Sequence, residues 1–318
     1  MRFGFVPKDE WDRQLFEKAF RDKKIECEVF DRPAQWIRFN SGIEAGYFRR
    51  EQDFSKFMRE EYAEAKKNTG KKDVKTSQLS GMLVRSVENA HGFRDEQTEF
   101  LFDYLSILEA EGMLVVNSPQ SIRNACRKHV AYYLLSKAGL PIPKSFASND
   151  AVRAYLELGE IGFPQVLKPC EGGGGAGVVY GGEAETSGDV TSLYGLMEKP
   201  VIVQEFVGDN TGDVRVIVVG DKVVGGIKRL TPKGLHKSNV TLGGKAEKIE
   251  VDDELGELSL KAADAVGCKI VGVDLIVGKD GYRILEVNSS PSFNGFKKAT
   301  GVKVEDIIVE YLVSQTRR

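Results

Sequence analysis

The stretch GVDLIVGKDGYRILEVN, residues 272–288, decides the fold towards the C-terminal end of this chain. Two β-rich runs flank Lys279-Asp280-Gly281, and a three-residue hairpin loop prefers glycine at its third, left-handed position. We therefore expect a β-hairpin in which Gly278 and Tyr282 flank the loop. Every other pairing in the hairpin follows by counting back from that pair.

The predicted register brings three oxygen-bearing side chains to one face. Asp274 lies opposite Glu286, and Asn288 shares their face because side chains two residues apart in a strand point the same way. Oxygen ligands suit Mg²⁺, which usually takes one or two carboxylates together with substrate phosphates. A hairpin with a polar solvent face would explain an isolated pair of carboxylates equally well. One loop register accounts for all three residues, which favours a metal site.

Composition bounds the remaining possibilities. The chain has 318 residues, 41% of them hydrophobic and 29% charged, which is enough to bury two or three cores. A net charge of −2 gives no basic field for nucleic acid. Four widely spaced cysteines, no signal segment and no apolar run near ~18 residues predict a reduced, cytoplasmic protein without a membrane partner.

Residues 1–118 are expected to form an α/β unit with a parallel sheet, because strands alternate with helices. The expected strands are 2–6, 27–30, 80–85 and 113–116, and the expected helices are 9–22 and 96–111. Residues 44–78 interleave basic and acidic side chains. They fit a solvated helix followed by a mobile loop, or a docking surface for an acidic substrate.

Two further units are expected, at 119–200 and 201–318. The first opens with a helix that Pro119 begins and Gly139 closes. It continues with helices at 150–158 and 186–197 and with strands at 165–169 and 177–180. The second contains strands at 201–207, 213–220 and 223–228, a helix at 253–266, the hairpin and a closing helix at 307–314.

A glycine run, Gly172-Gly-Gly-Gly-Ala-Gly177, is expected at the tip of a hairpin. Glycines let backbone N–H groups approach phosphate oxygens and cradle an anion. The run is not a P-loop, because no Gly-Lys-Ser/Thr follows, and a strand rather than a helix follows it, unlike a dinucleotide fingerprint. Alone it would equally fit a flexible connection. Lys168 lies six residues before Gly174, however, so cation and cradle can hold the same phosphates.

Polar groups also follow the next strands. Glu205 fits a group that reads the adenine amino group, or an exposed strand end, and Asp213 fits ribose hydroxyls. Arg215 and Arg229 are permanent cations that suit either ordinary ion pairs or the stabilisation of an anionic phosphoryl-transfer state. His236-Lys-Ser-Asn239, with two glycines soon after, offers cation and amide donors in a loop.

Together these motifs resemble the ATP-grasp superfamily, and most closely its RimK-type alpha-L-glutamate ligases. The resemblance covers residues 117–301. It rests on NSPQSI, LKPCEGGGGAGV, VQEFV, GDVRVIVVG, HKSN with a following GG, GVDLIVG, LEVNSSPSFNGF and KKATG, in that order. It implies an α/β ATP-grasp fold with a pre-ATP-grasp domain at 1–118, a central lid subdomain at 119–200 and a C-terminal subdomain with the metal site at 201–318.

The resemblance also implies roles for individual residues. It implies ATP contacts at Lys128, Lys168, Gly173, Gly174, Glu205, Phe206, Val207, Asp213, Lys237, Ser238 and Asn239. Asp274, Glu286 and Asn288 become ligands for about two Mg²⁺ or Mn²⁺ ions. Arg229 would contact the activated carboxylate, with Arg215 as a second catalytic cation. Two positions depart from the family pattern: Cys126-Arg127-Lys128 stands for Arg-Asp-Lys, and Lys237 stands for an arginine, giving a point charge instead of a bidentate fork.

The function implied is an ATP-dependent carboxylate–amine ligase that acts through an acyl phosphate and adds glutamate or another amino acid. The acceptor is open between a small coenzyme and a protein C-terminus, and a homo-oligomer is left open too. A non-catalytic ATP-binding regulator of the same fold is the alternative, and a dinucleotide-dependent oxidoreductase is weaker because no G-x-G-x-x-G follows a strand. Acceptor choice is expected in 1–116 and 231–244, with Arg85 as a candidate anion contact or a surface ion pair.

Overall fold

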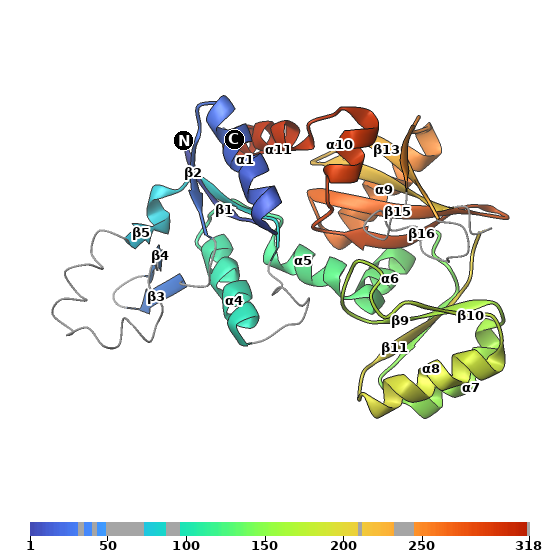
Figure 1. Ribbon diagram of the computed structural model, residues 1–318. Helices are drawn as coiled ribbons and strands as arrows, with labels where there is room; N and C mark the ends of the chain where they lie inside the picture. Colours follow the sequence, from blue (N-terminus) through green and yellow to red (C-terminus); the bar gives the residue numbers. More distant parts are fainter. Residues whose placement is uncertain are drawn as a thin grey trace. The chain divides into compact units, whose positions relative to one another are not determined.

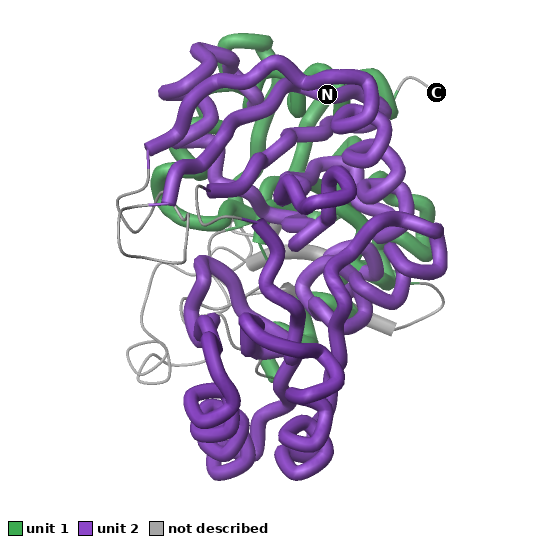
Figure 2. Tube along the Cα trace, turned by 90° about the vertical axis from the view of Figure 1, so that its right-hand side faces the viewer, with its two compact units in different colours: residues 1–119, 305–318 green, residues 120–304 purple. Residues whose placement is uncertain are grey.

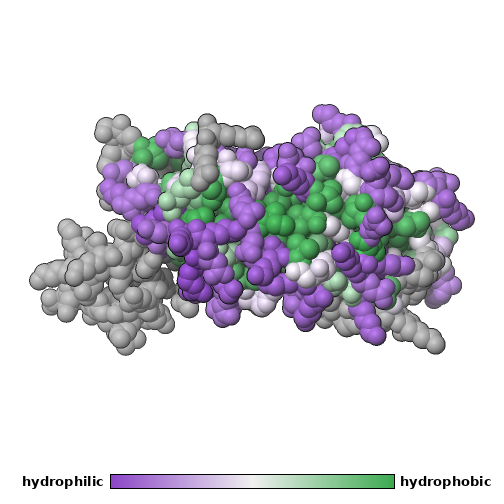
Figure 3. Space-filling view, turned by 90° about the horizontal axis from the view of Figure 1, so that it is seen from above, coloured by the Kyte–Doolittle hydropathy of each residue, from purple (hydrophilic) through white to green (hydrophobic). Residues whose placement is uncertain are grey.

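The computed structural model describes residues 1–30, 35–39, 43–48, 73–86, 96–208, 212–231 and 245–316. The chain forms two compact units, residues 1–119 with 305–318 and residues 120–304, shown in green and purple in Figure 2. Hydrophilic residues make up much of the face seen in Figure 3, with hydrophobic residues showing between them. Within the described ranges, no helix has the length and apolarity needed to cross a membrane.

The first unit is built on a parallel sheet of strand order β2-β1-β6-β7, as predicted. Its strands are β1 (Arg2–Val6), β2 (Glu26–Val29), β6 (Gly81–Val84) and β7 (Val115–Val116). Its helices are α1 (Glu10–Asp22), α4 (Glu96–Ala110) and, from the C-terminal end, α11 (Val304–Gln315). Phe3 and Phe5 of β1 pack their rings against Phe20 and Phe16 of α1, which fixes that helix on the sheet.

A small antiparallel sheet was not predicted. It consists of β3 (Gln35–Phe39), β4 (Ile43–Phe48) and β5 (Asp73–Lys75), and the 3₁₀ helix η1 (Thr76–Gln78) follows it. The expectation of a helix in 44–78 is therefore wrong for the parts of that range that the structure describes. The rest of 44–78 lies outside the described residues.

Arg85 is not a surface residue. Its side chain is 1% exposed, and its Nε lies 3.3 Å from Oδ1 of Asp12, which is also buried. Its guanidinium carbon sits 5.8 Å from the ring centroid of Phe16. The candidate role as an anion contact gives way to a buried ion pair that ties the end of β6 to α1.

The second unit contains two antiparallel sheets (Figure 1). The first has the order β10-β9-β11-β8, with β8 (Ser145–Ser148), β9 (Gln165–Pro169), β10 (Val179–Gly181) and β11 (Val201–Glu205). The helices α7 (Ala151–Ile161) and α8 (Ala184–Leu196) pack side by side against it, through a core that includes Leu158, Leu167 and Val203. Since β11 pairs with β8 and β9, it belongs to this sheet and not to the predicted unit 201–318.

The second sheet has the order β14-β13-β12-β15-β16. Its strands are β12 (Gly212–Val219), β13 (Lys222–Leu230), β14 (Ala246–Ile249), β15 (Ile270–Gly278) and β16 (Gly281–Asn288). The helix α9 (Asp253–Val266) begins at the cap Asp252, which accepts a hydrogen bond from Leu255 N, and ends at the left-handed Gly267. The short helix α10 is Asn294–Thr300. An apolar core that includes Leu135, Ile202, Val271 and Ile284 joins elements of both sheets.

The helix predicted between Pro119 and Gly139 is two helices, α5 (Pro119–Cys126) and α6 (Lys128–Lys137). Arg127 between them is extended, with φ −97° and ψ 94°. The break frees the backbone N–H of Lys128, which donates to Cys170 O at 2.8 Å. It therefore anchors the start of α6 beside the glycine run.

Candidate active site

One face of the five-stranded sheet collects most of the predicted site residues. Asp213 of β12 is directly opposite Arg229 of β13, and Arg215 of β12 is directly opposite Asp274 of β15. Asp274 in turn lies opposite Glu286 of β16. Directly opposed residues share a face of a sheet, and so do residues two apart in one strand. Asp213, Arg215, Arg229, Asp274, Glu286 and Asn288 therefore all point to the same side.

The register of the β15–β16 hairpin is as predicted at the site but not at the turn. Gly278 pairs with Gly281, so the connection has two residues, Lys279 and Asp280, instead of the three expected. A two-residue connection alone would place Asp274 opposite Leu285. One extra residue in β16 shifts the register between Asp274 and Leu275, and this bulge restores the pairing of Asp274 with Glu286.

Two contacts from α6 and the loop after it hold the bulge. The Tyr132 hydroxyl donates to Leu285 O at 2.8 Å, and Ile284 N donates to Pro141 O at 2.8 Å. Both satisfy backbone groups at the irregular point of the ladder. The Tyr132 oxygen also accepts from Lys168 Nζ at 2.6 Å. Tyr132 was not predicted as a site residue, yet it links the predicted metal hairpin to the predicted ATP lysine.

Asp274 is held by two guanidinium groups. Arg215 donates from Nε to Oδ1 at 2.6 Å and from Nη2 to Oδ2 at 2.7 Å, and Arg229 Nη2 donates to Oδ2 at 2.7 Å. Burial alone would raise the pKa of the Asp274 carboxyl, but the two arginines outweigh burial and hold that pKa below its usual range. Arg229 also donates to Asp213, from Nε to Oδ1 and from Nη2 to Oδ2. Burial would lower the pKa of Arg229, whereas Asp274 and Asp213 raise it.

Gly272 lies beside Pro291 and Arg215. A Cβ at Gly272 would lie 2.9 Å from Pro291 Cβ and 3.5 Å from Cδ and Nε of Arg215. The distance to Pro291 is too short for a side chain, whereas the distances to Arg215 are ordinary van der Waals contacts, so it is Pro291 that requires glycine at this position.

Of the two predicted ATP lysines, Lys128 contacts the glycine run, and Lys168 lies on β9, the strand before it. Lys168 of β9 is buried and donates to Gln204 Oε1 at 2.8 Å as well as to Tyr132. Lys128 donates to Gly172 O, and its Nζ lies 3.7 Å from Glu286 Oε1. Lys128 thus contacts both the start of the glycine run and the predicted metal hairpin.

The glycine run forms the connection of a hairpin, as predicted, since Leu167 pairs with Val179. Gly172, Gly174, Gly175 and Gly177 all have positive φ. A Cβ at Gly173 or Gly174 would meet nothing within 4 Å, so the backbone there is open to an approaching ligand.

Glu205, Phe206 and Val207, at and after the end of β11, were predicted to contact ATP. Glu205 Oε1 accepts from Lys144 N at 2.8 Å, so one carboxylate oxygen is engaged by the backbone. Phe206 packs edge-on against Tyr180, with ring centroids 5.2 Å apart. Val207 lies beside the predicted metal hairpin, because a Cβ at Gly278 would lie 3.1 Å from Val207 Cγ1. Lys237, Ser238 and Asn239, the other predicted ATP contacts, lie outside the described residues.

The donor set at the hairpin suits a hard divalent cation. Asp274, Glu286 and Asn288 supply only oxygen ligands, the kind that Mg²⁺ and Mn²⁺ prefer. Asn288 Oδ1 accepts from Ser290 N at 2.9 Å, which orients its amide. No three His, Cys, Asp or Glu side chains gather for a metal in the described ranges, so the site depends on the amide of Asn288.

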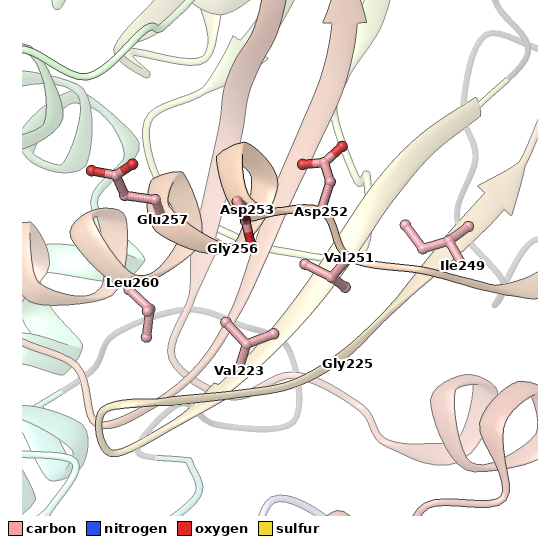
Figure 4. Close-up of a pocket in the computed structure, with 9 residues that line it drawn as sticks. All are labelled: Val223, Gly225, Ile249, Val251, Asp252, Asp253, Gly256, Glu257 and Leu260. Carbon is pink, nitrogen blue, oxygen red and sulfur yellow. The ribbon is translucent and has the colours of Figure 1, made fainter.

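A separate cavity of about 570 Å³ lies between β13, the end of β14 and the start of α9 (Figure 4). None of the predicted site residues lines it. Its lining residues are Val223, Gly225, Ile249, Val251, Asp252, Asp253, Gly256, Glu257 and Leu260. Asp252 caps α9, and Glu257 lies 2.6 Å from Lys261 Nζ, so both carboxylates have structural partners.

Comparisons with known proteins show the family of the chain. The family described as RimK-like ATP-grasp domain matches residues 125–312. A tetrahydromethanopterin:alpha-L-glutamate ligase of Methanosarcina acetivorans is 35% identical over 271 residues, covering 76% of this chain and 82% of that protein. A "Probable alpha-L-glutamate ligase" of Haemophilus influenzae is 32% identical over 221 residues, covering 69% of this chain and 73% of that protein.

Solved structures show the same fold. The ATP-grasp ligase PsnB, in complex with a minimal precursor, Mg and ADP, superimposes with a TM-score of 0.68 at 24% identity. The match covers 100% of this chain and 98% of PsnB. The fold class predicted for the chain, α/β with an ATP-grasp architecture, is thereby confirmed. With the family match over more than half of its length, the chain belongs to the RimK-like ATP-grasp family.

Proposed function

We propose that the chain is an ATP-dependent ligase that joins the amine of L-glutamate, or of another amino acid, to a carboxylate acceptor through an acyl phosphate. The observation that carries the proposal is the shared sheet face, where the oxygen donors Asp274, Glu286 and Asn288 lie beside Arg215 and Arg229. That set suits phosphoryl transfer, in which catalysis is mostly positioning and electrostatic stabilisation.

The residues divide between the two substrates. Lys128 at the start of the glycine run and Lys168 on the strand before it would supply the cations, and the backbone N–H groups of Gly173 and Gly174 would cradle the phosphates. Glu205, Phe206, Val207 and Asp213 would bind the nucleoside, with Lys237, Ser238 and Asn239 near the phosphates. Asp274, Glu286 and Asn288 would hold Mg²⁺ or Mn²⁺, which, when bound, neutralises charge on phosphate oxygens.

Arg229 would bind the acceptor carboxylate and the acyl phosphate made from it, with Arg215 as the second cation. Its guanidinium is a permanent charge with a planar fork that matches a carboxylate or phosphate. No enzyme nucleophile is needed, because the amine of the incoming amino acid displaces phosphate from the acyl phosphate.

Two kinds of acceptor are supported by relatives. The Methanosarcina protein is named for a pterin coenzyme, and a second structure of PsnB is complexed with a precursor peptide. The decisive assay combines the purified chain, ATP, Mg²⁺ and L-glutamate with a carboxylate-bearing pterin or with peptides that expose acidic residues. ADP release and a product mass increased by one glutamyl residue are expected with one acceptor class. Nucleotide binding without ADP release across both classes would favour the non-catalytic regulator instead.

Glu286→Gln is the variant of choice for the metal assignment, because its side chain is 33% exposed and its removal leaves the arginines paired with Asp274. We expect it to abolish ADP release while the thermal unfolding curve stays unchanged. Glu257→Gln, an exposed carboxylate on α9, is the matched control and should retain full turnover. Near-normal ADP release by Glu286→Gln would overturn the metal assignment.

A further inference from the structure

Four charged side chains form a row of ion pairs on the site face, which we call the quartet. Arg215 binds Asp274, Asp274 binds Arg229, and Arg229 binds Asp213. Two carboxylates and two guanidiniums cancel each other, so the quartet is neutral. Arg229, Asp213 and Asp274 are each less than a tenth exposed, which leaves little water to screen these contacts.

The quartet occupies the ligand atoms of Asp274. Its Oδ1 accepts from Arg215, and its Oδ2 accepts from both Arg215 and Arg229. A carboxylate has about four lone-pair sites, so three of them are already used. The charge of Asp274 is also already neutralised. A divalent cation that enters here must therefore compete with two guanidiniums for the same oxygens and must overcome their repulsion.

Arg229 is tied to the very residues assigned to the other two ligands. Asp213 is the predicted nucleoside contact, and Asp274 is the predicted metal ligand. We propose that Asp213 and Asp274 bind the Arg229 guanidinium until nucleotide and metal occupy these two carboxylates. Nucleotide and metal together then release the guanidinium for the acceptor carboxylate. Arg215 is the positioning residue that holds Asp274 in its pairing with Arg229. This inference rests on the proposed function.

The consequence is an order of binding. Without nucleotide and metal, Nε and Nη2 of Arg229 are engaged by Asp213 and Asp274, so its guanidinium must leave these carboxylates before the same nitrogens can bind the acceptor carboxylate. The coupling is reciprocal, since two ligands that favour the same arrangement strengthen each other's binding. The chain would then meet its acceptor only once phosphoryl donor and metal are in place.

The first test measures Mn²⁺ binding, by the loss of the free Mn²⁺ electron paramagnetic resonance signal, with a non-hydrolysable ATP analogue present at saturation. Arg215→Met removes one competitor, and we expect it to tighten Mn²⁺ binding at least tenfold. Arg215→Lys keeps the charge but loses the fork, so a smaller gain is expected. Arg283→Met is the matched control, because Arg283 lies on β16 but pairs with Asp280 and not with the quartet. It should change the affinity less than twofold.

The second test needs no substitution at the quartet during measurement. The Nε–H signals of Arg215 and Arg229 are followed by ¹⁵N nuclear magnetic resonance in the wild-type chain and assigned by their loss in Arg215→Lys and Arg229→Lys. We expect protected signals in the ligand-free protein. Mg²⁺ with the ATP analogue should shift the Arg229 signal and speed its exchange with water, whereas either ligand alone should have a smaller effect.

The outcomes separate this inference from the proposed function. If wild-type protein binds Mn²⁺ but Arg215→Met binds it no more tightly, and the Arg229 signal is unmoved by metal and nucleotide, the ion pairs of the quartet serve only to stabilise the fold. The metal site and the ligase function would then still stand. If wild-type protein binds no Mn²⁺ with the nucleotide analogue, both the metal assignment and this inference are wrong.

Discussion

Replacing Tyr132 by phenylalanine tests how the site is held together. The change removes one hydroxyl that donates to Leu285 O at 2.8 Å and accepts from Lys168 Nζ at 2.6 Å. The ring is retained, and so is its contact with the ammonium, which lies 5.1 Å from the ring centroid. Lys168 also keeps its bond to Gln204. The measured effect should therefore report the hydroxyl alone.

The magnitude follows from the two bonds. A hydrogen bond to a charged group contributes about 1.5–3 kcal/mol net and a neutral one about 0.5–1.5 kcal/mol. Since Tyr132 is 7% exposed, water replaces these bonds only in part. We expect the free energy of unfolding of the second unit to fall by about 2–4 kcal/mol. Mn²⁺ binding should weaken too, because the lost bond to Leu285 O holds the bulge that aligns Asp274 with Glu286.

Urea unfolding followed by circular dichroism measures the first effect, and Mn²⁺ titration measures the second. Tyr133→Phe is the matched control: the neighbouring tyrosine is 62% exposed, so its unfolding free energy should change by less than about 0.5 kcal/mol. If Tyr132→Phe unfolds and binds Mn²⁺ like the control, the hydroxyl does not secure the bulge and the reasoning fails.

Three further outcomes are expected. Arg85→Ala should lower the free energy of unfolding of the first unit by about 3–5 kcal/mol in urea, because it leaves the Asp12 carboxylate buried without the Arg85 cation. A loss below about 1 kcal/mol, or a selective rise in the KM for the acceptor, would restore the hypothesis that Arg85 contacts an anion. Burial raises the pKa of Cys170 to about 11, so about one Cys170 thiol in a thousand is a thiolate at pH 8. Cys170 of the native protein should therefore resist alkylation by iodoacetamide until the pH is raised or urea is added. Rapid alkylation of Cys170 at pH 8 would contradict this expectation. Amide hydrogen exchange at 172–177 should slow when an ATP analogue binds, since the backbone there is open; unchanged exchange would count against the phosphate cradle.

The sequence was informative wherever local chemistry decides the structure. The alternation of strands and helices predicted the parallel sheet of the first unit, and the glycine run predicted a hairpin connection. The helix expected at 253–266 is α9, and local chemistry marks both of its ends, with Asp252 as the N-cap and the left-handed Gly267 as the C-cap. These signals lie within a few residues of the element they determine.

What could not be predicted depends on distant partners. Tyr132 and the carbonyl of Leu285 are 153 residues apart, and no local pattern links them. The break at Arg127 lets Lys128 N donate to Cys170 O, which is far from it in the sequence. The arginines at Asp274 were predicted as cations, but their shared pairing with Asp274 requires the strand order β13-β12-β15, which no local sequence pattern indicates.

The hairpin shows why a right conclusion can rest on a wrong intermediate step. Side chains alternate strictly along a strand, so a register slip of one residue moves every later side chain to the other face. The two-residue turn, unaided, would have sent Glu286 and Asn288 away from Asp274. The bulge at Leu285 cancels that slip, and the predicted three-residue loop gave the same register because it placed its one extra residue, Gly281, in the turn instead. The shared face of the predicted metal ligands therefore depends on Tyr132 and Pro141, which secure the bulge, as much as on the acidic residues themselves.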